Sequence, residues 1–500
     1  MVTEEGLEGI ARHGRERPEA TALILGAERR TYGELDDRTN RLAHVLRGLG
    51  ADTGSRVAAV LPNGFEFFET ALATSRLGAG FLPVNWHLKT DELRWILGDS
   101  GAAVVVTDRE RVPGVQPAAD ALGCPVLVVG APYEGALQAL GDRLESLPSA
   151  ASWTPVFYTS GTTGRPKGVI HGRFTPEAVR AGQEGQRQLW SWSADDVHII
   201  SGPAYHAGPG GWSMTALYVG ATTVILPSWD AREWLRLVAA HRVTRSFMVP
   251  AHFIRILEVP DDERERFDVS SLRLIVHGAA PCPVEVKRRI IAVLAPAEIW
   301  ELYGMSEGGA TRIGPDDWTS HPGSVGKPWP GVEVRVLDEA GADLPPGEDG
   351  LIYILPPGGN RFQYHGDPEK TAGAWRAQGF TVGDVGHLDG DGFLYVTDRV
   401  ADMVISGGVN IYPREVEEAL HRHPAVVDCA VFGIPDARFG ESLCAVVECR
   451  TATSAEELAA HCRSLLADFK CPPRIDVVES LPRDPSGKVV KRHLREAYAR

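Results

Sequence analysis

Short apolar runs alternate with helical patterns in the first quarter of the chain, and this alternation limits the possible folds more than any other feature. Strands are expected at Val57–Leu61, Phe81–Val84 and Ala103–Val106. Helices are expected at Phe65–Leu77 and around Glu92–Leu97. Further strands are expected in the middle of the chain, at Thr222–Leu226 and Leu272–Val276. Alternation of strands and helices predicts parallel sheets with helices packed on their faces.

The pattern changes twice towards the C-terminus. From about Val332, strand-like runs lie between Gly, Pro and Asp turns, which is typical of antiparallel sheet. After Asp402, helices are expected at Arg414–His421 and Ala455–Leu466, and strands at Ala425–Gly433, Leu443–Glu448 and Ile475–Val478. The sequence predicts an α/β fold with a large N-terminal domain of parallel-type sheets, helices and a small antiparallel region (residues 1–400). A small α+β C-terminal domain is expected at residues 401–500.

Charge and cysteine content exclude several classes of function. Lys and Arg number 51 against 66 Asp and Glu, so the formal net charge is −15, which argues against broad nucleic-acid binding. The seven cysteines include no CxxC pair, so reduced thiols in a cytoplasmic protein are expected rather than disulfides or a zinc site. No apolar run reaches the roughly 18 residues of a membrane helix.

The segment Tyr158–Gly168 (YTSGTTGRPKG) carries the clearest chemistry. Hydroxyl side chains and glycines are concentrated in it, and Lys167 follows them. Backbone N–H groups and hydroxyls of such a loop can surround a polyphosphate, and the ammonium adds positive charge. A flexible Ser/Gly turn is the ordinary alternative, but it leaves the Arg-Pro-Lys-Gly ending unexplained. The loop is not a Walker A motif, because Pro166 stands where that motif requires glycine.

With this loop the chain resembles the superfamily of acyl-CoA synthetases, nonribosomal peptide adenylation domains and beetle luciferases, most closely the fatty-acid or aryl-CoA ligases. The resemblance covers nearly the whole chain, with the motifs in the family's order. It implies ATP, Mg²⁺ and coenzyme A as cofactors, and a mobile C-terminal domain. The residues that would hold the triphosphate are Thr159, Ser160, Gly161, Thr162, Thr163, Gly164 and Lys167.

A second segment, Tyr303-Gly304-Met305-Ser306-Glu307, is similar to the family's YGxTE, with Ser in place of Thr. The resemblance implies that Tyr303 stacks on adenine, Ser306 contacts the α-phosphate and Glu307 holds Mg²⁺. One carboxylate and a hydroxyl beside a phosphate can share a magnesium ion. The segment that would lie along the adenine and acyl groups, where small side chains permit close approach, is Gly278-Ala279-Ala280.

Three later residues match further positions of the family. Asp384, in VGD rather than the usual TGD, would bind the ribose hydroxyls, and Arg399 resembles a second ribose contact. Lys488 matches a late lysine of the family. An ammonium on a mobile domain can neutralise charge while a carboxylate attacks phosphorus.

Other matches concern the acceptor and the acid. Gly407 and Gly408 resemble the loop that borders the pantetheine tunnel of CoA ligases, whereas Ala401 stands at a hinge position that is usually Asp or Lys. His206 resembles an aromatic or His gate at the acid-binding pocket, and it is expected to act with Lys488, Ser306 and Glu307 in catalysis. Further candidates for the acid pocket are His252, Gly278 and Met305.

The resemblance implies an AMP-forming acid–thiol ligase that makes an acyl-adenylate and then a CoA thioester. Adenylate formation with an amine, a carrier protein or a small inorganic acid such as nitrite is the alternative. A non-catalytic nucleotide-binding protein is a third reading, and the joint presence of Lys167, Glu307, Asp384, Arg399 and Lys488 argues against it. Neither the acid nor the choice between monomer and homodimer follows from the sequence.

Overall fold

The structure is a computed structural model, and its described residues fall into two compact units. The first unit is Met1–Phe247 with Phe267–Leu272 and Asn360–Thr371, and the second is Met248–Arg266, Arg273–Gly359 and Ala372–Arg500. The described residues are 8–141, 144–145, 147, 155–159, 166–171, 176–357, 361–376, 379–400, 402–406, 409–436, 438–485 and 487–498. Among them, no helix has the length and apolar character that crossing a membrane requires.

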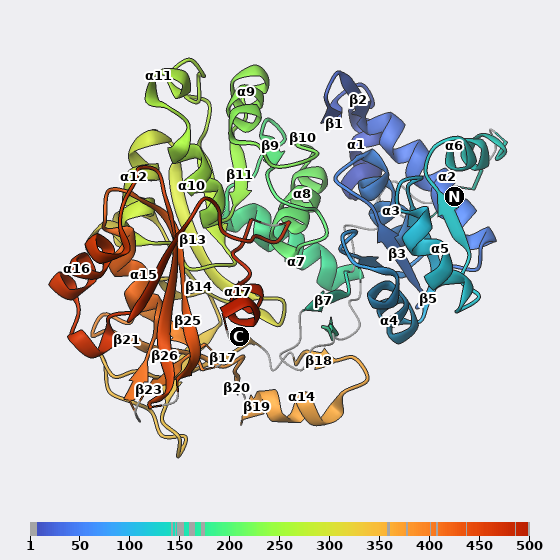
Figure 1. Ribbon diagram of the computed structural model, residues 1–500. Coiled ribbons are helices and arrows are strands. Elements are labelled where there is room, and N and C mark those ends of the chain that lie inside the picture. Colours follow the sequence, from blue (N-terminus) through green and yellow to red (C-terminus); the bar gives the residue numbers. More distant parts are fainter. Residues whose placement is uncertain are drawn as a thin grey trace. The chain divides into compact units, whose positions relative to one another are not determined.

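The first unit contains the parallel sheet that the alternating pattern predicts (Figure 1). Its strands are paired in the order β4 (Gly80–Pro83), β3 (Arg56–Val60), β5 (Ala102–Thr107) and β6 (Val126–Val128), all parallel. Helices α3 (Phe65–Arg76), α4 (Thr90–Ser100) and α5 (Val112–Asp120) connect them. Val57 and Ala59 face one hydrophobic cluster and Ala58 and Val60 face another, so β3 is covered on both sides.

A second sheet of this unit is paired in the order β11, β9, β10, β1 and β2. Strands β9 (Val197–Ile200), β10 (Thr222–Ile225), β11 (Arg245–Met248) and β1 (Thr21–Leu25) are parallel, and β2 (Glu28–Thr31) closes a hairpin with β1. The helices of this region are α1 (Gly9–Glu16), α2 (Tyr32–Gly48), α6 (Ala131–Gln138), α7 (Pro176–Leu189), α8 (Ala207–Val219) and α9 (Ala231–His241).

A small antiparallel sheet positions the ends of the phosphate-loop segment. Strand β7 (Phe157–Thr159) pairs with β8 (Lys167–Ile170) so that Thr159 lies opposite Lys167. On its other side β8 pairs with β18 (Gln363–Tyr364). Residues almost 200 positions apart in the sequence are thereby brought together.

The second unit begins with mixed pairing around β13. Strand β12 (Leu274–Gly278) runs parallel to β13 (Glu298–Met305), which forms a hairpin with β14 (Gly308–Ile313), and β15 (Lys327–Pro328) pairs with β14. The helices nearby are α10 (Pro250–Glu258), α11 (Asp261–Arg264), α12 (Val284–Val293) and α13 (Pro315–Ser320). The predicted strand Leu272–Val276 is therefore wrong at its start, because the Leu272 N–H closes a turn on the Val269 carbonyl.

The predicted antiparallel region is confirmed. It contains β16 (Glu333–Leu337), β17 (Gly350–Leu355), β19 (Trp375–Arg376), β20 (Gly379–Phe380), β21 (Asp384–Leu388) and β22 (Leu394–Arg399). Every described pairing among these strands is antiparallel. The register sets Asp384 directly opposite Arg399.

The last hundred residues form the expected α+β arrangement. The strands are β23 (Val404–Ser406), β24 (Val409–Ile411), β25 (Val426–Asp436), β26 (Gly440–Cys449) and β27 (Arg474–Val478), and the helices α15 (Pro413–His421), α16 (Ala455–Leu465) and α17 (Lys491–Tyr498). Val431 packs in a cluster with residues of α15 and α16, while Phe432 packs with Leu494 of α17. Both faces of β25 are thus covered by helices (Figure 1).

The fold as a whole is mixed α/β with a large N-terminal domain and a smaller C-terminal domain. The domain boundary near residue 400 stays a prediction.

Candidate functional site

Lys167, the cation expected at the phosphates, lies at the start of β8 and is paired with Asp367. The side chains of Lys167 and Asp367 are 18% and 30% exposed. The hydrogen bond from Lys167 is the main reason why the pKa of Asp367 is lowered. Of the expected phosphate loop, Ser160, Gly161, Thr162, Thr163 and Gly164 lie outside the described residues, and Thr159 ends β7.

Aromatic and polar contacts fix the strands beside this loop. The Tyr158 hydroxyl donates to Asp99 Oδ2 at 2.6 Å, and Trp95 Nε1 donates to the Pro166 carbonyl at 3.3 Å. A side chain at Gly168 would come within 3.1 Å of the Tyr158 ring. The backbone of β8 is therefore seated closely against β7, and this fixes the point at which the loop begins and ends.

The segment Gly278-Ala279-Ala280 leaves β12 in a conformation that only small residues allow. A Cβ on Gly278 would lie 2.5 Å from the Leu302 carbonyl oxygen of β13, so no side chain fits there. Ala279 has φ of 66°, in the left-handed region that a residue with a side chain rarely adopts. Strain of this kind is typical of functional segments, because surrounding structure must hold it.

Tyr303, Gly304 and Met305 form the end of β13, and Ser306 and Glu307 follow in the turn to β14. The register of the hairpin shifts between Tyr303 and Gly304, and a Cβ on Gly304 would lie 3.0 Å from the Gly309 Cα. This bulge changes the direction of the strand at the predicted nucleotide segment.

Asp384 joins two other residues that the sequence predicted separately. The Tyr303 hydroxyl donates to its Oδ2 at 2.6 Å, and Arg399 Nε donates to its Oδ1 at 2.8 Å. The Asp384 side chain is 5% exposed whereas that of Arg399 is 61% exposed. Burial, and then the charge of Asp384, raise the pKa of Tyr303 well above its ordinary value, so the phenol stays a donor. The structure thus brings together residues 81 and 15 positions apart.

Lys488 lies in a tight turn of the same unit. Its backbone N–H donates to Asp484 Oδ1 at 3.0 Å, its carbonyl accepts from the Asp484 N–H at 2.8 Å, and Gly487 supplies a φ of 87°. Burial is the main cause that lowers the pKa of Lys488, Asp484 opposes the shift, and the Arg399 guanidinium adds to it. The ammonium is therefore close enough to interact with the charge of Arg399, one of the three residues of the Asp384 cluster (Tyr303, Asp384 and Arg399).

The two candidate histidines have different surroundings. His206 occupies the position before the first residue of α8, is exposed, and has its ring 4.6 Å from that of Tyr205. His252 is buried at the start of α10, and its Nδ1 accepts the Val249 N–H at 3.3 Å. Burial lowers the pKa of His252 to about 3, which keeps it neutral. His206 belongs to the first unit and the Asp384 cluster to the second, whereas Gly407, Gly408 and the hinge residue Ala401 lie outside the described residues.

A buried ion pair joins α12 to β13, and no sequence motif predicts it. Lys287 of α12 is fully buried, and its Nζ lies 2.6 Å from Glu301 Oε2. His277 Nε2 is 3.6 Å from the same oxygen, and burial followed by the Lys287 charge holds its pKa well below the ordinary value. Glu301 precedes Tyr303 by two residues and His277 precedes Gly278. The pair therefore ties α12 to the strand ends that carry the predicted nucleotide segments.

The oxygen donors present suit magnesium bound together with a phosphate. Among the described parts of the chain, no group of three or more His, Cys, Asp or Glu residues could enclose a metal ion. Glu307 offers one carboxylate beside the Ser306 hydroxyl, and both are half-buried. Mg²⁺ commonly takes one or two carboxylates and completes its shell with phosphate oxygens and water, so these residues fit that ion.

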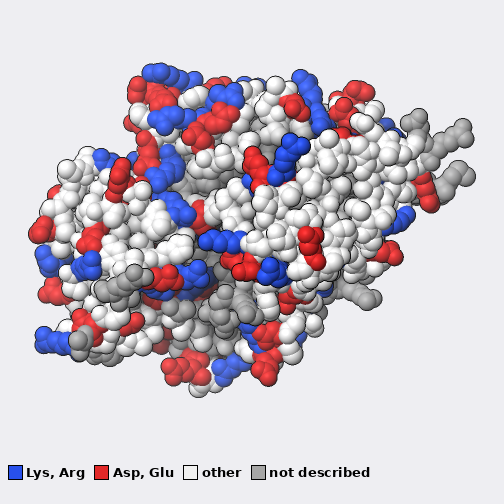
Figure 2. Space-filling model, turned by 45° about the vertical axis from the view of Figure 1, so that its right-hand side comes forward, with Lys and Arg blue, Asp and Glu red and all other residues white. Residues whose placement is uncertain are grey.

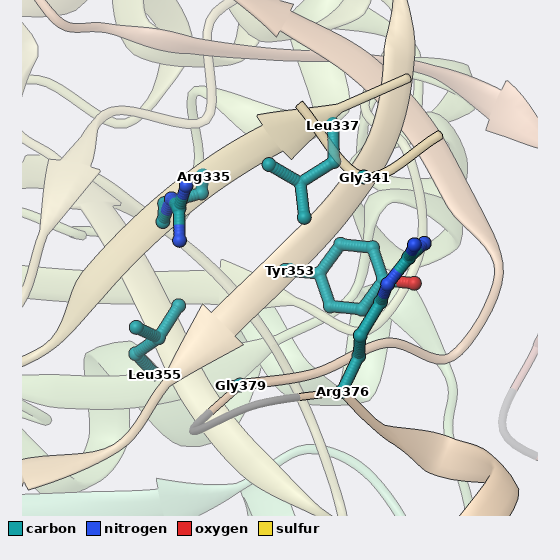
Figure 3. Close-up of a pocket in the computed structure, with 7 residues that line it drawn as sticks. All are labelled: Arg335, Leu337, Gly341, Tyr353, Leu355, Arg376 and Gly379. Carbon is teal, nitrogen blue, oxygen red and sulfur yellow. The ribbon is translucent and has the colours of Figure 1, made fainter. Parts of the chain in front are cut away.

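Figures 2 and 3 show the charge on one face of the molecule and a pocket in the antiparallel region. On the face shown in Figure 2, basic and acidic side chains are interspersed. A pocket between strands of the antiparallel region is lined by Arg335, Tyr353 and Arg376 among others (Figure 3). Arg335 Nε donates to Asp343 at 2.7 Å and Arg376 to the Ala340 carbonyl at 3.0 Å. Both guanidinium groups are already engaged by the protein.

Comparison with known proteins agrees with this arrangement. The family described as "AMP-binding enzyme" matches residues 10–360, and "AMP-binding enzyme C-terminal domain" matches residues 415–488. A feruloyl-CoA synthase of Amycolatopsis sp is 36% identical over 495 residues, covering 97% of this chain and 98% of that protein. The fatty acid–[acyl-carrier-protein] ligase ScoC of Streptomyces coeruleorubidus is 31% identical over 496 residues, with 97% and 95% covered.

Among solved structures, ATP-bound MatB from Rhodopseudomonas palustris superposes with a TM-score of 0.86 at 32% identity, covering 98% of each chain. The similarity therefore extends over nearly the whole length of the sequence and of the fold. The chain belongs to the AMP-binding enzyme family.

Proposed function

We propose that the protein activates an organic acid with ATP, releases pyrophosphate, and passes the acyl group to the thiol of coenzyme A. The observation that carries the proposal is the convergence of Tyr303 and Arg399 on the buried Asp384 carboxylate, with the Lys488 ammonium in electrostatic reach. Membership of the AMP-binding enzyme family and the name of the feruloyl-CoA synthase relative support it.

The chemistry divides into two displacements. First, a carboxylate oxygen of the acid attacks the α-phosphorus, and the bond to the pyrophosphate oxygen breaks. Then the acceptor thiolate attacks the acyl carbonyl carbon, and AMP leaves with the bonding electron pair. Both steps rely on positioning and on charge stabilisation rather than on a protein nucleophile.

Each residue has a role that its chemistry supports. Asp384 would accept hydrogen bonds from the ribose hydroxyls beside Arg399, and Lys488 would offset the negative charge that develops at phosphorus. Lys167 and the loop at residues 159–164 would hold the β- and γ-phosphates, and Ser306 the α-phosphate. Mg²⁺, when bound through Glu307, would neutralise phosphate charge.

The acceptor and the cellular context belong to the same proposal. The relative named as an acyl-carrier-protein ligase favours a carrier-protein thiol as the second candidate acceptor. Gly407 and Gly408 would border the entry of either thiol, on a C-terminal domain (residues 401–500) that moves between the two steps. All seven cysteines are free, which supports a cytoplasmic location.

Pyrophosphate release from Mg-ATP tests the proposal. A panel of aliphatic and aromatic acids is assayed with and without coenzyme A, and products are identified by mass, with the Lys488→Ala variant as control. We expect release that depends on one class of acid and yields AMP and its CoA thioester, and that is lost in the variant. Acid-dependent release without a thioester would rule out coenzyme A and direct the assay to carrier proteins and amines.

A further inference from the structure

We propose that Arg255, Glu448 and Arg483 are positioning residues that hold Lys488 in place for the acid-activating step. This inference rests on the function proposed above. None of the three would touch the nucleotide or the acid in this role, because each acts through the turn that carries Lys488.

A continuous set of charged contacts leads from α10 to the Lys488 turn. Arg255 of α10 donates through Nη1 to Glu448 Oε1 at 2.9 Å. Glu448 Oε2 accepts from Arg483 Nη2 at 3.2 Å and from the Leu481 N–H at 3.1 Å. Arg483 Nη1 then donates to the carbonyl of Gly487 at 3.1 Å, and Gly487 immediately precedes Lys488.

The central carboxylate is buried, which makes these contacts strong and specific. The Glu448 side chain is 6% exposed and that of Arg483 is 15% exposed. Arg483 also pairs with Asp428, at 2.7 Å between Nη2 and Oδ2. A buried charge that loses a partner is costly, so the network defines one geometry for the turn rather than several.

Packing against α10 gives the turn a second, independent restraint. A Cβ built on Gly487 would lie 3.2 Å from the Ala251 Cβ, so the turn and the first residues of α10 are in close contact. Gly487 has φ of 87°, a conformation that suits glycine. Ala251 and Arg255 lie one helical turn apart on α10, and they therefore approach the Lys488 turn and Glu448 from the same side of the helix.

A separate contact joins α15 to α12, a helix that packs against α10. Glu418 Oε2 accepts the N–H of Val284, the first residue of α12, at 3.3 Å. The residue before it, Pro283, makes no side-chain cap. A carboxylate at that end of a helix is favourable, because the first N–H groups lack partners within the helix.

The kinetic consequence differs between the two steps. Lys488 is needed when charge develops at phosphorus and not when a thiol displaces AMP. Loosening its turn should therefore slow activation selectively. An error of about 1 Å in the position of a reacting group can cost up to about a hundredfold in rate, so a partly loosened turn is expected to cost roughly tenfold.

The test measures the two half-reactions separately in the full-length protein. Activation is followed as acid-dependent exchange of pyrophosphate into ATP, and transfer as thioester formation from supplied acyl-adenylate. For Arg255→Met we expect kcat for exchange to fall roughly tenfold with KM for ATP and the transfer rate changed less than about twofold. Arg255→Lys should recover part of the loss, since it keeps the charge.

Two further variants keep the result interpretable. Arg236→Met removes an exposed ion pair with Glu233 on α9 and should leave both half-reactions unchanged. Glu418→Met removes the contact between α15 and α12, which does not include the Lys488 turn, so any loss that it causes should be equal in the two half-reactions. Thermal unfolding of each variant identifies any that fails to fold.

The outcomes separate this inference from the proposed function. A wild-type protein without acid-dependent exchange would overturn the proposed function and the inference together. A wild type that exchanges, with Arg255→Met equal to it in both half-reactions, would overturn the inference alone. An equal loss in both half-reactions would also overturn it, because general destabilisation would then explain the effect.

Discussion

The β7–β8 hairpin of the first unit and the Asp384 cluster of the second both set a cation against an aspartate, but they do so differently. Lys167 and Asp367 are each partly exposed, and Asp367 also accepts the Lys370 N–H at 2.9 Å. Asp384 is nearly inaccessible and receives two side-chain donors from other strands.

The difference indicates how each region would bind a nucleotide. Lys167 neutralises Asp367, so an incoming phosphate competes with a carboxylate for the same ammonium. A partly exposed pair of this kind contributes little to stability, so it can be exchanged at low cost. Asp384 is already held by Tyr303 and Arg399, so the second region is assembled before the ligand binds and needs no exchange.

The largest effect is expected for Asp384→Ala. Tyr303 would lose the acceptor of its hydroxyl, Arg399 would lose its partner, and the proposed ribose contact would disappear. We expect acid-dependent pyrophosphate exchange to fall roughly a hundredfold and the free energy of unfolding to fall by about 1–3 kcal/mol.

The matched control for that variant is Asp349→Ala. Asp349 accepts from His387 of β21 at 2.8 Å and from Thr397 of β22 at 2.8 Å, so it contacts the strand pair that carries Asp384 and Arg399, but it is exposed. Equal losses of exchange in the two variants would show that the β21–β22 pair, and not the Asp384 carboxylate, is what matters.

In the first region, Lys167→Met is expected to raise KM for ATP about tenfold, because a charged hydrogen bond to phosphate contributes about 1.5–3 kcal/mol. Stability should change little. Lys370→Met removes a neighbouring ammonium, 4.7 Å from the Tyr364 ring, and is the control for charge alone. An equal rise in KM for ATP in both variants would mean that Lys167 contributes only positive charge and no specific contact with phosphate.

One buried histidine in each unit is expected to make the stability of the folded protein sensitive to acid. Burial lowers the pKa of His198 in the first unit and of His252 in the second to about 3, against 6.5 for an exposed imidazole. Both rings are neutral when folded and gain protons below pH 6.5 when unfolded. Their contribution to stability is therefore complete above pH 6.5 and is lost progressively as pH falls from 6.5 towards 3.

For His252→Gln, the decline of unfolding free energy between pH 6.5 and 4.5 should be shallower than in the wild type by roughly 1 kcal/mol per pH unit. Denaturant titrations at several pH values measure it, with His493→Gln at an exposed position as control. An unchanged slope in His252→Gln would mean that this histidine is protonated in the folded protein.

Local patterns were sufficient for much of the fold. The strand predicted at Val57–Leu61 and the helix predicted at Phe65–Leu77 agree with β3 and α3 within one residue at each end. Both elements are buried almost throughout, so their apolar runs follow directly from packing. The predicted start of β12 was wrong. The turn that closes at Leu272 depends on a backbone hydrogen bond, which the side-chain types do not predict.

Site residues could be predicted where they belong to a sequence motif. They could not be predicted where their role depends on a partner that is distant in the sequence. The aspartate and arginine of the Asp384 cluster were each identified by resemblance, and the β21–β22 register then explains their contact. No motif identifies Asp367, Glu301 or Arg483. Each of them acts through a contact with a residue that only folding brings near. Lys287 offered a weak signal, since it is a charged residue between the apolar positions Val286 and Ile290 of one helix.

Asp367→Asn has the smallest expected effect. It tests most directly whether the Lys167–Asp367 pair differs from the Asp384 cluster in being exchanged when the nucleotide binds. The amide keeps the size of the carboxylate and can still accept the Lys370 N–H, but it no longer competes with phosphate for Lys167. If the hairpin works by exchange, KM for ATP should fall by about two- to threefold, and stability should change little, as is usual for a substitution near the surface. ATP-dependent exchange kinetics and thermal unfolding measure the two quantities. A rise in KM for ATP would mean instead that Asp367 positions Lys167 for the phosphates, and the first region would then be as preorganised as the second.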